Sequence, residues 1–233
     1  FKITIVDPQK KKNSSSAALG LLIGNMYQKS KGRSWELRKK SNELWPRWIK
    51  FLKQYNNNLN IEKPLIQLTT EQKTFDNLNK FISHHPMRGL NVLEEDSAII
   101  QNINKIFNMN NLRGIISNQD GRIDPISLLK TLNLCLKNEK INCINEEIIK
   151  IKKLNNQWIS TCSNKVEITS DVIVLCNSID AIKLIDLNSH QIKLKPVLGQ
   201  AMEISVNEKE INLLSLPNHF SINGKNFLRI NKN

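Results

Sequence analysis

The chain has 233 residues, of which 39% are hydrophobic and 24% are charged, and this balance excludes a chain too polar to bury a core. Its formal net charge of +13 would normally indicate a nucleic-acid or anionic partner. Most lysines, however, are scattered among Asn and Ile residues, and only residues 10–12 and 150–153 form clusters. We therefore expect solvated turns at these clusters rather than a concentrated electrostatic surface.

Hydropathy and cysteine spacing give no sign of a membrane protein or of a metal site. No apolar run approaches the ~18 residues that a spanning helix needs, and no signal peptide is visible. The cysteines are widely spaced and form no C-x-x-C pair: Cys135, Cys143, Cys162 and Cys176. We expect no metal ligands and reduced, buried thiols in a cytoplasmic protein.

The first distinctive stretch is a short apolar strand, 3–6, that ends on Asp7. A strand that ends on one carboxylate is how a dinucleotide-binding fold presents an acceptor to the ribose hydroxyls. Small residues follow at 14–18 and at Gly20, and they would let the backbone approach a flat cofactor closely. A buried strand, a turn Asp and a Ser-capped helix explain the same residues, so residue chemistry alone leaves both interpretations open.

Val6-Asp7 followed by 14–22 resembles the second strand and flavin-contacting loop of the D-amino-acid oxidase and glycine oxidase family. That family most often has Glu where this chain has Asp7. The resemblance implies that Asp7 contacts the ribose of FAD and that a branched side chain at Gly20 would occupy space needed by the isoalloxazine. The loop contacts that it implies are Ser14, Ser15, Ala18, Gly20, Leu21 and Leu22. In the family a G-x-G-x-x-G turn precedes this strand. Because nothing precedes Phe1 here, we expect a fragment that begins on the second strand of a larger fold.

Apolar residues recur at three- to four-residue steps over 33–55, which predicts a helix. Pro46 inside this run should kink or interrupt it. The stripe of apolar residues that contains Trp48 is expected to be core.

The next segments predict alternating strands and helices. We expect a strand at 65–69, a helix at 71–82 and a strand at 89–93 that leads into a helix start. Between them, His84 and His85 are neighbours in an expected loop, and side chains that are adjacent in extended structure point to opposite faces. We therefore expect no shared metal ion at this pair.

A strand at 114–117, a turn at 118–121 and a helix from Asp124 through Leu136 follow. Asp124 is well placed as the N-cap, with Pro125 at the first helical position. The stretch 120–125 resembles the family's d-G-x-v-d-P signature. In the family the chain returns there from the substrate domain to the flavin domain.

Residues 142–176 predict a series of strands, with a hairpin turn at Asn155-Asn156. The last of them, 172–176, is a fully apolar strand of the buried parallel kind. In the family this strand ends in a Gly-containing turn near the cofactor, and here that turn is Asn177-Ser178. The resemblance implies further cofactor contacts at Ile148, whose counterpart lies beside the adenine, and at Asn177.

Residues 196–200 match the family's P-v-x-G-Q motif, which opens a long strand (201–206) into the substrate domain. The segment 227–230 resembles the strand in which glycine oxidases place a Tyr that faces the substrate. The resemblance therefore implies that Phe227 contacts the substrate without a hydroxyl. The family's carboxylate-binding Arg lies further on and is not in this chain.

These matches predict an α/β fold that combines an incomplete Rossmann-like FAD-binding domain with an antiparallel-sheet substrate domain. The FAD-binding domain would comprise 1–60 and 122–195, and the substrate domain 61–121 and 196–233. The implied function is FAD-dependent oxidation of a small amine or amino acid, in which hydride passes to the flavin and the imine is hydrolysed. This scheme needs no side-chain general base, so we name no catalytic residue.

Two alternatives stay open. The first is an oxidase domain that acts on a carboxymethylaminomethyl wobble uridine in tRNA, which the basic charge favours. The dispersal of the lysines disfavours it. The second is an inactive, truncated remnant. The sequence does not identify the amine, the electron acceptor or the oligomeric state.

Overall fold

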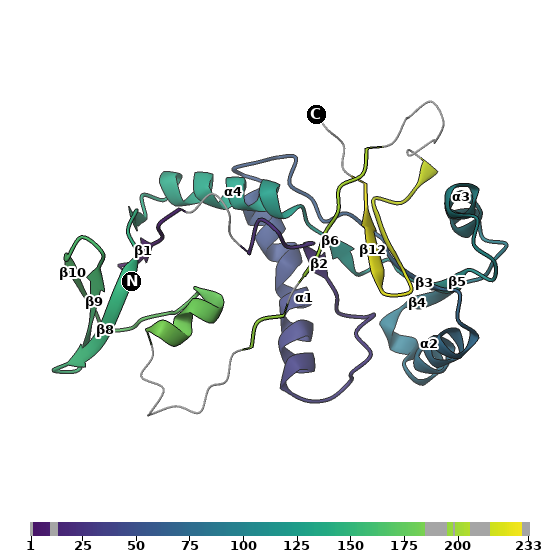
Figure 1. Ribbon diagram of the computed structural model, residues 1–233, viewed down its shortest axis with the longest axis horizontal. Coiled ribbons are helices and arrows are strands. Elements are labelled where there is room, and N and C mark those ends of the chain that lie inside the picture. The colour runs from purple at the N-terminus through teal and green to yellow at the C-terminus, as the bar shows by residue number, and fades with distance from the viewer. Residues whose placement is uncertain (1, 10–13, 185–194, 198, 206–214, 230–233) are drawn as a thin grey trace. The chain divides into compact units, whose positions relative to one another are not determined.

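The computed structural model describes residues 2–9, 14–184, 195–197, 199–205 and 215–229 (Figure 1). The helices are α1 (Arg33–Leu52), α2 (Gln72–His84), α3 (Ala98–Phe107) and α4 (Pro125–Asn138), with 3-10 turns η1 (Pro86–Arg88) and η2 (Ser178–Lys183). The strands are β1 (Thr4–Val6), β2 (Leu21–Leu22), β3 (Leu65–Thr69), β4 (Leu90–Leu93), β5 (Arg113–Ser117), β6 (Gly121–Arg122), β7 (Asn142–Ile144), β8 (Ile148–Leu154), β9 (Gln157–Cys162), β10 (Glu167–Ser170), β11 (His219–Ile222) and β12 (Lys225–Leu228). The predicted lysine cluster at 10–12, together with Leu198 and Val206, lies outside the described residues.

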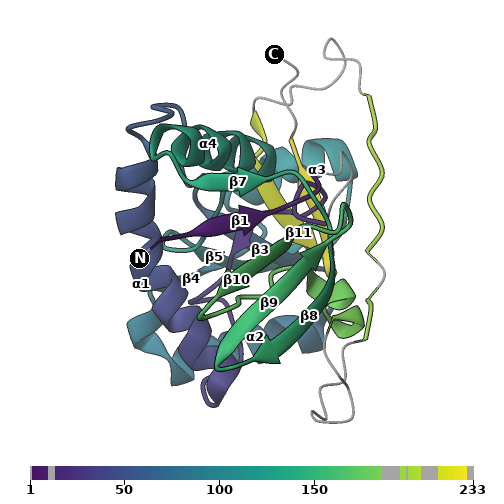
Figure 2. The same cartoon turned by 90° about the vertical axis from the view of Figure 1, so that its left-hand side faces the viewer.

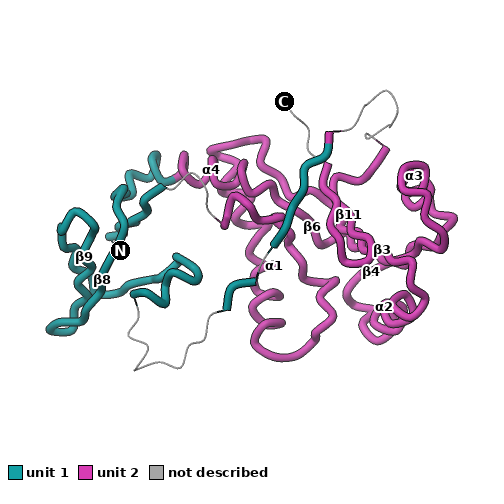
Figure 3. Tube along the Cα trace, viewed as in Figure 1, with its two compact units in different colours: residues 1–12, 136–204 teal, residues 13–135, 205–233 magenta. Residues whose placement is uncertain are grey.

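The chain divides into two compact units, each made of two segments (Figure 3). Unit 1 comprises 1–12 and 136–204, and unit 2 comprises 13–135 and 205–233. These boundaries differ from those of the four domain segments expected from the sequence, which stay a prediction.

Unit 2 is built on a five-stranded sheet with the order β12-β11-β3-β5-β4. Three of the four strand pairs are antiparallel, and β11 runs parallel to β3. Gly114 on β5 lies against the backbone of β3, where an added Cβ would be 2.0 Å from the carbonyl oxygen of Gln67. A glycine is therefore required for these two strands to approach as they do.

Helices cover both faces of this sheet (Figure 1). On one face, α3 packs its buried Ile100 and Ile103 onto Ile66, Leu68 and Phe220 of the sheet. On the other face, α2 contributes Leu78 and Phe81 to a cluster with Leu65, Leu90 and Ile115. Alternate residues of each strand thus serve two separate hydrophobic cores, as strand geometry requires.

A third core joins α1, α4 and strand β2 within unit 2. The buried residues of this core are Leu52, Leu59 and Ile123, and Trp45 and Ile49 of α1 pack against them. Helix α1 continues through Pro46, so the expected interruption does not occur. Packing of the face formed by Trp45, Ile49 and Leu52 offsets the hydrogen bond that a proline removes.

The buried face of α1 agrees only in part with the stripe expected from the sequence. Trp48 is 47% exposed and Leu37 is 63% exposed, so these two are not core, whereas Leu52 of the same stripe is buried. The predicted cap of α4 is confirmed, because the Asp124 Oδ2 accepts a hydrogen bond of 2.7 Å from the backbone N–H of Ser127. None of the four α-helices in the described residues is long and apolar enough to cross a membrane.

Unit 1 contains a parallel pair, β1 with β7, and an antiparallel meander, β8-β9-β10 (Figure 2). Two-residue connections between strands favour turns with positive φ at both positions. Asn155 and Asn156 have φ of 48° and 65°, so the hairpin turn expected from the sequence is confirmed.

Two strands expected from the sequence, one in the FAD-binding domain and one opening the second part of the substrate domain, are wrong for the described residues. Residues 172–176 and 201–205 form no strand, and Val172 and Val174 are 74% and 78% exposed. A buried parallel strand needs hydrogen-bonding partners at its edges. No strand among the described residues of unit 1 pairs with either segment.

Candidate functional site

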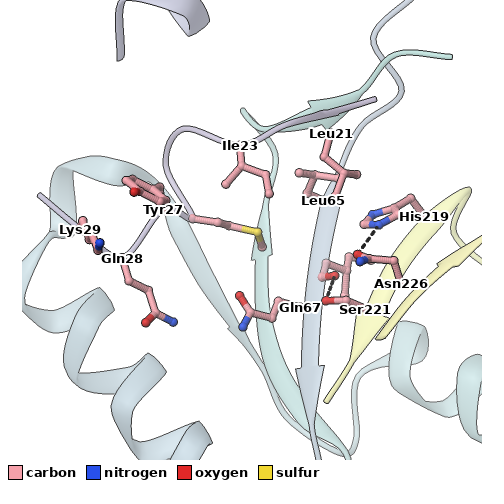
Figure 4. Close-up of a pocket in the computed structure, with 12 residues that line it drawn as sticks. Leu21, Ile23, Tyr27, Gln28, Lys29, Leu65, Gln67, His219, Ser221 and Asn226 are labelled. Atoms are coloured by element: carbon pink, nitrogen blue, oxygen red, sulfur yellow. Dashed lines mark hydrogen bonds between the residues drawn. The ribbon is translucent and has the colours of Figure 1, made fainter. Parts of the chain in front are cut away.

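Unit 2 contains a pocket of about 390 Å³ between the sheet and the chain that follows β2 (Figure 4). This volume lies within the range that small-molecule sites occupy, roughly 300–1,000 Å³. The lining residues come from both sides: Leu21, Ile23, Met26, Tyr27, Gln28 and Lys29 from the loop side, and Leu65, Ile66, Gln67, His219, Ser221 and Asn226 from the sheet side.

The register of strands β3, β11 and β12 places the polar residues of the sheet side on one face of the sheet. Ser221 of β11 pairs with Gln67 of β3 on one side and with Asn226 of β12 on the other. Paired residues point to the same face of a sheet, and so do residues two apart along a strand. His219, Ser221, Gln67 and Asn226 therefore share the face that borders the pocket, and Figure 4 shows their side chains on that side.

The loop side is held by the buried carboxylate of Asp120, which is 1% exposed. Its Oδ1 accepts hydrogen bonds of 2.9 Å from the backbone N–H groups of Gly24 and Asn25, and its Oδ2 accepts one of 2.7 Å from Met26. Asn42 of α1 adds a side-chain donor at 3.3 Å. Because charged acceptors form the stronger hydrogen bonds, one carboxylate fixes the backbone just before the pocket-lining residues Tyr27–Lys29.

Arg88 holds the same loop through its carbonyl groups. Its Nη1 donates to the backbone oxygens of Asn25 at 3.1 Å and of Tyr27 at 2.5 Å. The guanidinium lies over the rings of Trp35 at 4.1 Å and Phe81 at 4.9 Å from their centroids. Burial lowers the pKa of Arg88 and the nearby Asp120 carboxylate opposes that change, so the cation is paired by charge as well as by hydrogen bonds.

His219 and Asn226 form a polar pair at the sheet side of the pocket. The His219 Nε2 lies 3.1 Å from the Asn226 Oδ1, and His219 is 5% exposed. Burial lowers the pKa of His219, and the charge of Arg122 lowers it further. The hydrogen bond to Asn226 and the charge of Glu62 act in the opposite direction, but the net shift is downward. The imidazole is therefore neutral at pH 7, and because an amide oxygen only accepts, Nε2 carries the proton.

The predicted cofactor residues of unit 1 are Asp7, Ile148 and Asn177. Asp7 lies exposed at the carboxyl end of β1, where its backbone N–H donates to the Ile144 oxygen at 3.0 Å. Its Oδ1 accepts a hydrogen bond of 2.9 Å from the Gln9 N–H. This arrangement fits a contact with ribose hydroxyls, because a carboxylate has acceptor positions beyond the one that Gln9 occupies. Ile148 begins β8, next to a register shift.

Asn177 precedes the 3-10 turn η2 with φ of −89°. Ser178 has a positive φ of 55°. The two residues still form the turn after 172–176, as predicted.

The predicted flavin-loop residues fall in unit 2. Ser14, Ser15 and Ala18 are exposed in a turn. Leu21 and Leu22 alternate along β2, so Leu21 lines the pocket while Leu22 packs against the core of α1 and α4. The cofactor residues implied by the resemblance are thus divided between unit 1 and unit 2. Of these residues, Leu21 of unit 2 lines the pocket.

Gly20 has a packing requirement of its own. Its φ is +74°, and an added Cβ would lie 1.9 Å from the carbonyl oxygen of Ile123. The two residues also share a backbone hydrogen bond of 3.0 Å from the Ile123 N–H to the Gly20 oxygen. A glycine is needed here whether or not a cofactor lies nearby.

The predicted substrate contact, Phe227, lies on the other face of the sheet. Its ring stacks on Phe220 with 5.2 Å between centroids and meets Phe107 of α3 edge-on at 5.0 Å. Its neighbour in the strand, Asn226, is the β12 residue that lines the pocket. Neighbours in a strand face opposite sides of the sheet, so Phe227 does not line this pocket, and its contact with a substrate stays a prediction.

Sequence reasoning missed the residues that shape the pocket. Asp120 was visible only as a turn residue, although an Asp that follows a buried strand signals a possible anchor. Arg88, His219 and Asn226 carried no signal, because their roles depend on contacts with residues far away in the sequence. No group of three His, Cys, Asp or Glu side chains among the described residues is arranged to hold a metal ion.

Comparison with known proteins gives matches in structure alone. No family model matches the sequence, and no curated protein matches it. The fold matches glycine oxidase from Geobacillus kaustophilus with a TM-score of 0.64 and 19% identity, over 78% of this chain and 50% of that one. Glycine oxidase from Bacillus cereus ATCC 14579 matches with a TM-score of 0.65 and 18% identity, over 81% of this chain and 52% of that one.

A third match is iminodiacetate oxidase from Chelativorans sp. BNC1, with a TM-score of 0.62 and 15% identity, over 79% of this chain and 51% of that one. The chain thus spans about half the length of these solved structures. The predicted α/β fold class is confirmed by these matches, and at such identities the likeness concerns the fold. The fold of this chain is similar to the corresponding half of these glycine oxidases and of the iminodiacetate oxidase, in agreement with the resemblance seen in its motifs.

Proposed function

We propose that this chain belongs to an FAD-dependent oxidoreductase that oxidises a small amine or amino acid. One observation carries the proposal: Leu21, in the stretch that resembles a flavin-contacting loop, borders the same pocket as the polar residues of the five-stranded sheet. A cofactor on the loop side and a substrate on the sheet side would then meet at one place. The structural likeness to glycine oxidases and an iminodiacetate oxidase supports this proposal.

The residues of the chain would bind and orient the reactants. Leu21, Ile23, Met26 and Leu65 give part of the pocket an apolar lining, against which the carbon atoms of a small substrate would pack. FAD, when bound, would supply the chemistry, because it accepts the hydride that carries both electrons away from the amine, while the nitrogen loses a proton. The released imine would be hydrolysed by water to a carbonyl compound and an amine or ammonia.

In unit 1, the Asp7 carboxylate would accept hydrogen bonds from the ribose hydroxyls of FAD. Its exposed position at the carboxyl end of a strand in a parallel pair supports this role. Ser14 and Ser15 remain proposed contacts of the cofactor, because their hydroxyls are exposed and can donate hydrogen bonds.

The proposal is tested by purifying the protein in which the chain occurs, with any sequence that adjoins it, and dialysing it against buffer. We expect FAD to be retained and glycine, N-methylglycine or another small amine to release carbonyl product. Protein that is fully folded but retains no FAD after incubation with it would refute the proposal. Salt-dependent affinity for tRNA, together with oxidation of its wobble uridine, would favour the tRNA alternative instead.

A further inference from the structure

The pocket of unit 2 presents donors and a cation but no carboxylate. Among its lining residues the one charged side chain is Lys29, on the loop side, and the sheet side carries the amides of Gln67 and Asn226. Ser221 also lines the sheet side, but its hydroxyl donates to the backbone oxygen of Ile66 at 3.4 Å. Figure 4 shows Lys29 and Asn226 on opposite sides of the pocket. A ligand with oxygen acceptors or a negative charge would therefore meet complementary groups, whereas a cation would not.

The hydrogen bond from His219 fixes which end of the Asn226 amide is available. Because the neutral imidazole donates from Nε2, the Asn226 Oδ1 is occupied as an acceptor. The Nδ2 group then has two N–H donors, and no hydrogen bond to the described residues engages them. Asn226 is exposed and its amide end points into the pocket (Figure 4). Because His219 is buried on β11, its hydrogen bond fixes the orientation of the Asn226 side chain.

We propose that Asn226, oriented by His219, is a specificity-determining residue that donates a hydrogen bond from Nδ2 to a carboxylate oxygen of the ligand. Lys29 adds the opposite charge from the loop side. If the proposed function holds, the ligand is an amino acid and this carboxylate is its carboxylate group, so the identity of the natural ligand rests on the proposed function. Binding of a carboxylate at this pocket needs neither FAD nor turnover, and it can be tested separately.

The experiment measures binding of propionate to the full chain by NMR, with the side-chain N–H signals of Asn226 as the local reporter. Asn226→Asp keeps the acceptor for His219, removes both N–H donors and adds a negative charge. Loss of a hydrogen bond to a charged group corresponds to about a tenfold or greater loss of affinity. Asn91→Asp is the matched control, because Asn91 is exposed on β4 of the same sheet and does not line the pocket.

We expect propionate to shift the Asn226 side-chain signals, and to bind Asn226→Asp at least about tenfold more weakly and Asn91→Asp with unchanged affinity. Propylamine, a cation of the same size, should not compete. His219→Phe removes the orienting donor and should weaken propionate binding severalfold, while His219→Gln retains a donor and should restore much of it. Equal propionate affinities in wild type and Asn226→Asp would overturn the proposal, and so would shifts that map outside the pocket. Failure of the protein to retain FAD would leave these results unaffected.

Discussion

Replacement of Gly20 by Ala tests how closely β2 must approach the start of α4. Gly20 has φ of +74°, and the new Cβ would lie 1.9 Å from the Ile123 carbonyl oxygen and 3.1 Å from Cγ of Pro125. The oxygen belongs to the backbone and cannot turn away. The sequence resemblance implied that a branched side chain at Gly20 would occupy space needed by the isoalloxazine, and this contact shows that a side chain there also conflicts with the fold.

Two terms contribute to the expected loss of stability. An L-residue in the left-handed region costs about 1–2 kcal/mol, and insertion of a methyl group against packed backbone costs about 1–3 kcal/mol. Gly224→Ala is the matched control, because Gly224 has φ of +77° and nothing lies within 4 Å of an added Cβ. The control should therefore lose only the conformational term, about 1–2 kcal/mol.

The assay is urea-induced unfolding followed by tryptophan fluorescence, with the free energy of unfolding compared between the two variants. We expect Gly20→Ala to be less stable than Gly224→Ala by about 1–3 kcal/mol. If the two variants lose the same stability, the close approach of Gly20 to Ile123 does not constrain the fold, and the reasoning fails.

Three further predictions concern the pocket and the cofactor. Asp120→Ala leaves the backbone N–H groups of the buried Gly24 and Met26 and of the half-buried Asn25 without their acceptor, so we expect a loss of about 3–5 kcal/mol in urea unfolding. The exposed Asp96→Asn should lose less than about 0.5 kcal/mol. Burial lowers the pKa of His219 below its ordinary 6.5, so the unfolded chain takes up this proton first as the pH falls. The wild type should then lose stability relative to His219→Gln below about pH 6.5, by at most about 1.4 kcal/mol per pH unit, and a difference independent of pH would contradict this. Asp7→Ala should weaken FAD binding about tenfold in a titration, and an unchanged affinity would remove Asp7 from the cofactor site.

Local patterns were sufficient to predict most elements of unit 2. The strand at 65–69, the helix that became α2 and the cap at Asp124 depend on periodicity and on residues within one turn, which a sequence displays directly. The hairpin turn at Asn155-Asn156 was equally visible, because both positions need positive φ.

Features that depend on distant partners could not be predicted in this way. Residues 172–176 have the composition of a buried strand but form none among the described residues, since composition does not supply the pairing edge. Asp120 binds backbone 94 to 96 residues earlier in the chain, and no local pattern shows such a contact. Asn226 lines the pocket and its strand neighbour Phe227 does not, so a shift of one residue decides which side chain reaches the pocket.

We propose above all that the chain is part of a flavoprotein that oxidises an amine. The most direct test is to add an amine, without oxygen, to the purified protein loaded with FAD. The visible absorbance of the bound flavin is measured before and after glycine or N-methylglycine is added. We predict that the absorbance is lost as the flavin is reduced and that it returns when air is admitted. A flavin that stays oxidised with every amine and amino acid tried would contradict the claim.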